Sequence, residues 1–261
     1  MIIDSHSHYL PKEILKWASF YSETFSDIKT RIEIMDEVGI DKAVLTYPTT
    51  DAAQKAKVSE AEISKIFNDS VAEIIKKYPE RFIGTAVIAP FDKKEMLREL
   101  ERAIDELGLK GISLASSYQG VYLDDERLWP LYDRIIELNI PVFVHATTQK
   151  PMGYERLVHP LLTPVMEYVF DITVFIGKLI TSETLERFPE LKFVFAHFGG
   201  VMPFIRERFD TIYEMLYGRR VIEKLPKLPS EYLKEIYVDT SGSSSKDTLL
   251  STMETVGIDH I

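Results

Sequence analysis

Short apolar runs alternate with amphipathic helical stretches along all 261 residues, and this alternation constrains the fold more than any other feature. Seven runs rich in Val, Ile and Phe have the length of strands and lack a strict apolar–polar alternation. Such continuous apolar strands are typical of sheets that are buried on both faces. The predicted strands cover residues 2–4, 42–46, 82–88, 111–116, 141–146, 192–197 and 236–240.

Between these runs, apolar residues follow the spacing of an amphipathic helix. In one segment Met96, Leu100, Ala103 and Leu107 share a face, and Gly108 follows at a position that favours helix termination. Helices are predicted at 28–38, 59–78, 95–107, 127–138, 203–217 and 246–256, with a longer helical stretch at 161–187.

Repeated strand–helix units in this number predict an α/β fold in which a parallel sheet closes into a (β/α)₈ TIM barrel, as a single domain over residues 1–261. An open doubly wound sheet is the alternative, but such sheets normally carry a glycine-rich phosphate loop after the first strand. Neither Gly-x-Gly-x-x-Gly nor a Walker A sequence occurs. Residues 9–27 and 147–160 are enlarged loops after the first and fifth strands, on the barrel face where active sites are built.

The composition excludes several classes of function. A net charge of −10 disfavours unspecific nucleic-acid binding, and the absence of cysteine excludes disulfides and thiolate metal ligands. Asp4 and His6 interrupt the first apolar run, so no signal peptide is recognised, and no apolar stretch approaches the ~18 residues of a membrane span. We expect a cytoplasmic protein that acts on a small molecule, without nucleic-acid or membrane partners.

Four of the six histidines stand at the ends of predicted strands. His6 and His8 follow the first strand two residues apart and therefore share a strand face, together with Asp4. His145 ends the fifth strand and His197 the sixth. Because the carboxyl ends of all barrel strands meet at one mouth, these imidazoles are predicted to surround one metal ion.

Several segments of the chain, including those that carry the histidines, resemble a known family. Residues 3–11 (IDSHSHYLP) are similar to the Asp-x-His-x-His opening of the amidohydrolase superfamily. Segments 31–39 (RIEIMDEVG), 78–84 (YPERFIG), 141–145 (PVFVH) and 188–200 (FPELKFVFAHFGG) resemble its amidohydrolase 2 branch, the aminocarboxymuconate-semialdehyde decarboxylase-like proteins. The resemblance extends along essentially the whole chain and implies a metal-dependent (β/α)₈ enzyme.

The resemblance also implies roles for particular residues. His6, His8 and His145 match the family's metal ligands, and His197 matches a catalytic histidine beside the ion. Arg31 falls where the decarboxylases carry an arginine that binds a substrate carboxylate.

One departure from the family concerns its last metal-site residue, an aspartate at the end of the eighth strand. The sequence ends at 257–261 (GIDHI), where that strand is expected to begin, and Asp259 lies too early to match. We therefore expect a barrel that lacks its eighth strand and last helix in this chain. Such a chain is expected to bind the metal weakly or to be inactive.

Other polar residues have two interpretations each. His159, in the loop after the fifth strand, is either a substrate-binding or a surface residue. Asp239 ends the seventh strand and either orients a histidine, as Asp4 could also do, or is a turn carboxylate. The serines at 241–245 are interpreted as a helix N-cap cluster rather than an anion-binding loop.

The predicted cofactor is one divalent metal ion, with Zn as the first expectation and Mn, Co, Ni or Fe compatible with the same ligands. A single ion is favoured because residues 111–116 contain no lysine that could bridge two ions. The resemblance leaves two reactions open, non-oxidative decarboxylation of a small carboxylic acid and hydrolysis of a lactone, amide or ester by metal-bound water. An inactive barrel that serves as a binding scaffold is the third interpretation, and a homodimer is compatible with all three.

Overall fold

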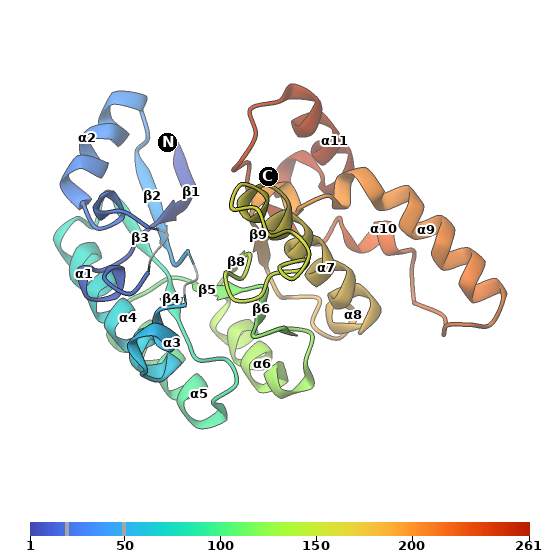
Figure 1. Ribbon diagram of the computed structural model, residues 1–261, viewed down its shortest axis with the longest axis horizontal. Coiled ribbons are helices and arrows are strands. Elements are labelled where there is room, and N and C mark those ends of the chain that lie inside the picture. The colour runs from blue at the N-terminus through green and yellow to red at the C-terminus, as the bar shows by residue number, and fades with distance from the viewer. Residues whose placement is uncertain (19–20, 49–50) are drawn as a thin grey trace.

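The computed structural model describes residues 1–18, 21–48 and 51–261. Its strands run parallel and are separated by helices (Figure 1). They are β1 (Ile3–His8), β2 (Lys42–Thr46), β3 (Phe82–Gly84), β4 (Ala86–Val87), β5 (Ile112–Ala115), β8 (Val142–His145), β9 (Phe193–Phe195) and β10 (Tyr237–Val238). A separate antiparallel hairpin consists of β6 (Ser117–Tyr118) and β7 (Val121–Tyr122).

The order of the parallel strands follows the chain, as it does in a (β/α)₈ barrel. The ladder β1-β2-β3 and the ladder β4-β5-β8-β9-β10 meet at Thr85, whose N–H donates to the carbonyl of Leu45 at 3.3 Å. β3 and β4 therefore form one interrupted strand, and the seven predicted strands are all present. Within the described residues β1 and β10 share no ladder, so both remain sheet edges.

Helices cover the outer face of the sheet (Figure 1). They are α1 (Lys12–Leu15), α2 (Ile28–Val38), α3 (Ala52–Ala56), α4 (Glu60–Lys77), α5 (Lys93–Glu101), α6 (Trp129–Leu138), α7 (Tyr168–Thr181), α8 (Thr184–Arg187), α9 (Met202–Gly218), α10 (Pro229–Tyr232) and α11 (Lys246–Val256). Short 3₁₀ turns lie at Glu23–Phe25, Glu126–Leu128, His197–Gly199 and Ile258–His260, and π turns at Arg102–Glu106 and Thr163–Glu167.

Helix α4 shows why the predicted helices form where they do. Ser59 caps its first turn by accepting the N–H of Glu62, and Phe67 and Val71 are fully buried on its inner face. The helix packs so closely on β3 that a Cβ at Gly84 would lie 2.6 Å from the Cγ1 of Val71. Glycine at this position allows the helix to bury its apolar stripe against the strand.

Several predicted bounds differ from the structure. The predicted helical stretch 161–187 is divided into the π turn, α7 and α8, with Glu183 in the left-handed conformation (φ 59°) between the two helices. The sixth strand ends at Phe195, and His197 lies in the turn after it. The first strand is longer than predicted and continues to His8, with a register irregularity between Asp4 and Ser7. This extension brings both histidines onto the sheet itself.

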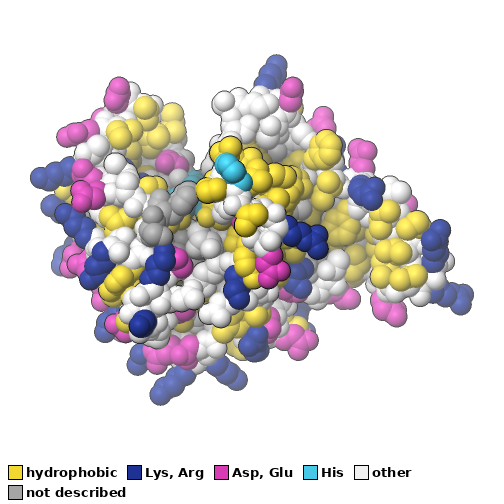
Figure 2. Space-filling model, viewed as in Figure 1, with side chains coloured by type: hydrophobic (Ala, Val, Ile, Leu, Met, Phe, Trp, Pro, Cys, Tyr) yellow, Lys and Arg dark blue, Asp and Glu magenta, His cyan; other side chains and the backbone are white. Residues whose placement is uncertain are grey.

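Exposed apolar side chains gather on the segment that follows β8. Met152, Tyr154, Val158, Leu161 and Val165 are all at least 40% exposed. In Figure 2 hydrophobic side chains cover this part of the visible face. No helix in the described part of the chain is long and apolar enough to cross a membrane.

Candidate metal centre and active site

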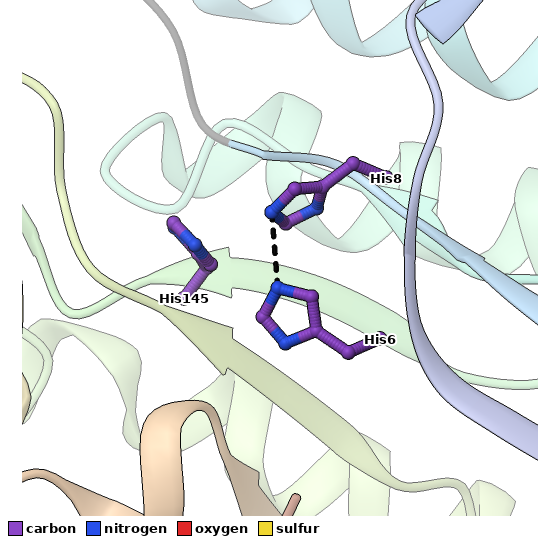
Figure 3. Close-up of side chains that lie close together, drawn as sticks. All are labelled: His6, His8 and His145. Atoms are coloured by element: carbon purple, nitrogen blue, oxygen red, sulfur yellow. Dashed lines mark hydrogen bonds between the residues drawn. The ribbon is translucent and has the colours of Figure 1, made fainter. Parts of the chain in front are cut away.

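Three histidine rings from β1 and β8, which belong to separate ladders, meet at the carboxyl ends of these strands (Figure 3). The Nε2 atoms of His6 and His8 lie 3.0 Å apart, and one ring nitrogen from each of His6, His8 and His145 lies within 4.8 Å of the others. β1 carries the first two rings, and His145 is the last residue of β8. The convergence predicted from the strand ends is therefore present in the structure.

Each ring has a hydrogen-bond partner at Nδ1. His6 Nδ1 lies 2.6 Å from the Oδ2 of Asp239, and His145 Nδ1 lies 3.0 Å from the carbonyl oxygen of Ala146. His8 Nδ1 lies 3.3 Å from the hydroxyl of Thr46. Carboxylate and carbonyl oxygens only accept, so Nδ1 carries the proton in His6 and His145, and Nε2 carries the lone pair.

This donor set fits a divalent cation. The Nε2 atoms of His6 and His8 face each other at 3.0 Å, and the hydroxyl of Thr46 can accept the Nδ1–H of His8. With the proton on Nδ1, the Nε2 of His8 offers a lone pair to a cation beside that of His6. One nitrogen from each of the three rings lies within 4.8 Å of the others, so one cation with bonds of ~2.0–2.1 Å to imidazole could be held by all three. The cavity on the sheet side of the rings holds only about 10 Å³, so a substrate must approach from the mouth of the barrel.

The electrostatics keep His8 and His145 neutral. Burial and then the neighbouring histidines lower the pKa of His145 to about 3, and burial lowers the pKa of His8 well below its usual value. Burial alone would raise the pKa of Asp239, but the hydrogen bond and charge of His6 and the hydrogen bonds of Ser241 lower it to about 2. Asp239 is thus ionised, and His8 and His145 are neutral, as a metal requires of imidazole ligands.

His197 completes the cluster from the turn after β9. Its ring centroid lies 5.4 Å from that of His6 and 5.3 Å from that of His145. His197 and Phe198 both adopt φ of 58°, a left-handed conformation that costs a non-glycine residue about 1–2 kcal/mol. The backbone N–H of His197 donates to the Oδ1 of Asp239 at 2.9 Å, which holds the strained turn against β10.

Arg31 lies on α2 and supports β1. Its guanidinium donates to the hydroxyl of Ser7 and to the backbone carbonyl of His8. Together with Asp4 and Ser7 it lines a cavity of about 320 Å³ that contains none of the four clustered histidines. Burial lowers the pKa of Arg31. In the structure Arg31 thus contacts β1, the strand that carries His6 and His8. Its contact with a substrate carboxylate stays a prediction.

Two further predicted site residues lie apart from the ring nitrogens. Asp4 accepts the backbone N–H of His6 at 2.9 Å, so within the described contacts it acts on the strand rather than on an imidazole ring. His159 is exposed, and its Nδ1 accepts the N–H of Leu161 at 3.2 Å. The exposure of His159 agrees with its interpretation as a surface residue. Its binding of a substrate stays a prediction.

One residue of the site was not recognised in the sequence. Ser245 caps α11 by accepting the N–H of Thr248, as predicted for this serine run. Ser241 instead lies beside His197, with its hydroxyl oxygen 2.9 Å from Nδ1. The only signal in the sequence is its position two residues after Asp239, at the end of β10.

Comparison with known proteins agrees with this geometry. A family model described as amidohydrolase matches residues 3–256. The chain belongs to this amidohydrolase family. Gamma-resorcylate decarboxylase of Polaromonas sp. strain JS666 is 27% identical over 262 residues, which cover 94% of this chain and 78% of the relative. A 2-amino-3-carboxymuconate-6-semialdehyde decarboxylase of Dictyostelium discoideum is 28% identical over 267 residues, covering 91% and 74%.

A solved structure of this amidohydrolase fold also matches. The dihydroxybenzoic acid decarboxylase of Polaromonas sp. JS666, solved with manganese and the inhibitor 2-nitroresorcinol, superposes with a TM-score of 0.82 at 26% identity. The match covers 100% of this chain and 84% of that one. The predicted family and the (β/α)₈ barrel class are thus confirmed.

Proposed function

We propose that this protein is a metal-dependent, non-oxidative decarboxylase of a small aromatic or unsaturated carboxylic acid. The observation that carries the proposal is the cluster of one ring nitrogen from each of His6, His8 and His145, with the ring of His197 beside them. The relatives named as decarboxylases support this choice over the other reactions of the family.

His6, His8 and His145 would hold one divalent cation through Nε2, and Asp239 would orient His6 through its Nδ1. Zn²⁺ and Mn²⁺ are the leading candidates, since imidazole suits zinc and a related structure contains manganese. When bound, the ion supplies positive charge that anchors substrate oxygens and stabilises the charge that develops on them.

His197 is the residue that moves the proton. In a decarboxylation the bond between the ring carbon and the carboxyl carbon breaks, carbon dioxide leaves, and the electron pair remains on the ring carbon. That carbon must take up one proton. His197 would first accept this proton from solvent on its free ring nitrogen and then deliver it from the same atom. Burial lowers the pKa of His197, so the resting ring is neutral and its nitrogen is free to accept.

The test begins with protein purified without chelators. Elemental analysis gives the metal, and the metal-free protein is then reloaded with Mn²⁺, Zn²⁺ or Mg²⁺ and incubated with 2,6-dihydroxybenzoate, 5-carboxyvanillate and related hydroxybenzoates. We expect metal-dependent release of carbon dioxide, which is lost in a His145→Ala variant. Ring opening of lactones without carbon dioxide would instead identify a hydrolase. Absence of any bound metal would leave the binding-scaffold interpretation and refute the proposal.

A further inference from the structure

A single carboxylate connects the candidate ligand His6 with His197. Asp239 receives the Nδ1–H of His6 on Oδ2 at 2.6 Å. Its Oδ1 accepts the backbone N–H of His197 at 2.9 Å, and both the backbone N–H (3.0 Å) and the hydroxyl (2.6 Å) of Ser241. Asp239 is 7% exposed, so these donors and not water satisfy most of its hydrogen-bonding capacity.

The hydroxyl of Ser241 has one hydrogen and two lone pairs, and all three are used. The hydrogen must point to Asp239, because an ionised carboxylate can only accept. The oxygen then accepts the backbone N–H of His197 at 3.2 Å and, at 2.9 Å, the ring atom Nδ1 of the same residue. For that second contact to be a hydrogen bond, Nδ1 of His197 must carry the proton.

The backbone holds this arrangement in place. The N–H of Phe198 donates to the carbonyl of Asp239 at 3.1 Å, which ties the left-handed turn to the end of β10. Gly242 adopts φ of +87°, and a Cβ at this position would lie 3.5 Å from the Nδ1 of His197. The Nδ1 edge of the ring therefore lies against the 239–242 segment.

We propose that Ser241 is a positioning residue that sets the tautomer of His197, with the proton on Nδ1 and the lone pair on Nε2. Asp239 would thereby assign the same tautomer to two histidines, directly in His6 and through Ser241 in His197. The consequence for catalysis rests on the proposed function, because it concerns the proton that Nε2 accepts and delivers. The tautomer itself does not depend on which reaction the protein catalyses.

The first test reads the tautomer by NMR. Protein with ¹⁵N-labelled histidine is examined by long-range ¹H–¹⁵N correlation, both without metal and with zinc, and His197 is assigned with a His197→Asn variant. We expect a protonated Nδ1 in the wild type and a mixture or the opposite tautomer in Ser241→Ala. A wild-type His197 protonated on Nε2, or an unchanged tautomer in Ser241→Ala, would overturn the proposal.

The second test separates positioning from a general loss of structure. In the metal-loaded enzyme, Ser241→Ala should lower kcat by about 10- to 100-fold, the usual range for residues that orient a functional imidazole, with KM and metal content unchanged. Ser241→Thr keeps the hydroxyl and should restore both the tautomer and most of the activity. Ser244→Ala removes an exposed hydroxyl of the same segment and serves as the matched control.

The outcomes distinguish this proposal from the proposed function. If no carboxylic acid is decarboxylated but the tautomer shifts in Ser241→Ala, the function fails and the role of Ser241 stands. If decarboxylation occurs and Ser241→Ala keeps full kcat, the role of Ser241 fails. Loss of bound metal in Ser241→Ala would assign the serine to the ion site and would also refute the positioning role.

Discussion

Replacement of Asp171 tests whether one buried carboxylate holds the segment next to the metal centre. Asp171, on α7, is 1% exposed and accepts the hydroxyls of Ser116 and Tyr122 and, at 2.9 Å, the backbone N–H of Met152. Ser116 in turn accepts the N–H of Thr147, two residues after His145. The carboxylate thus joins α7, the end of β5 and the start of the 147–160 segment.

The expected cost of Asp171→Ala follows from these partners. The hydroxyls of Ser116 and Tyr122 lose their acceptor, and a buried unpaired donor costs about 1–3 kcal/mol, or about 4 kcal/mol for the two. Met152 is exposed, so its N–H can bind water instead. Burial raises the pKa of Asp171, so its charge is itself unfavourable, and loss of that charge offsets part of this cost.

Urea unfolding measures this change, with Asp171→Asn as the matched control. The amide keeps an acceptor and loses the charge, so its expected cost is ~1 kcal/mol. Hydrogen exchange of residues 147–152 should accelerate in Asp171→Ala and much less in Asp171→Asn. A free energy of unfolding within ~0.5 kcal/mol of the wild type, or unchanged exchange in this segment, would refute the reasoning.

Three further predictions concern the site. Gly200→Ala should lower the free energy of unfolding by about 3 kcal/mol in urea titrations, because Gly200 has φ of +72° and a Cβ would lie 2.5 Å from the carbonyl of Val169. His145→Ala should weaken zinc binding at least about 100-fold in competition titrations, since one of three ligands is removed. Burial lowers the pKa values of His8, His145 and His197, so these rings stay neutral in the fold and take up protons on unfolding below pH ~6.5. The free energy of unfolding of the metal-free protein should therefore fall by about 1.4 kcal/mol per pH unit per ring as the pH falls below ~6.5. A free energy of unfolding that does not change with pH in this range would contradict the prediction.

The strands could be predicted because their apolar runs are too short for helices and too regularly spaced for loops. The convergence of His6, His8 and His145 followed from a property of the architecture, since every parallel strand of a barrel ends at the same mouth. The left-handed turn at His197 was not predicted, because a residue after an apolar run is expected to continue the strand. The glycine pair that follows it, Gly199 and Gly200, was the available signal.

Side-chain contacts between elements that are distant in the sequence could not be predicted from the sequence. Arg31 was assigned to a substrate carboxylate by resemblance, whereas its observed partners on β1 depend on where α2 packs. Ser241 is indistinguishable from its serine neighbours in sequence, and only the position of β10 beside β9 brings it to His197. Local patterns identify elements and strand ends, but hydrogen-bond partners require the register between elements.

The hydrogen bond between His6, on β1, and Asp239, directly after β10, joins residues 233 positions apart at the two strands that remain sheet edges. A ligand that binds His6 only in the native state would therefore stabilise the contact between the first and the last strand of the sheet. At a concentration one hundred times its dissociation constant, such a ligand adds ~2.7 kcal/mol to the free energy of unfolding. Thermal melting should consequently report occupancy of the centre, and hydrogen exchange should slow at both borders together when the cation is added.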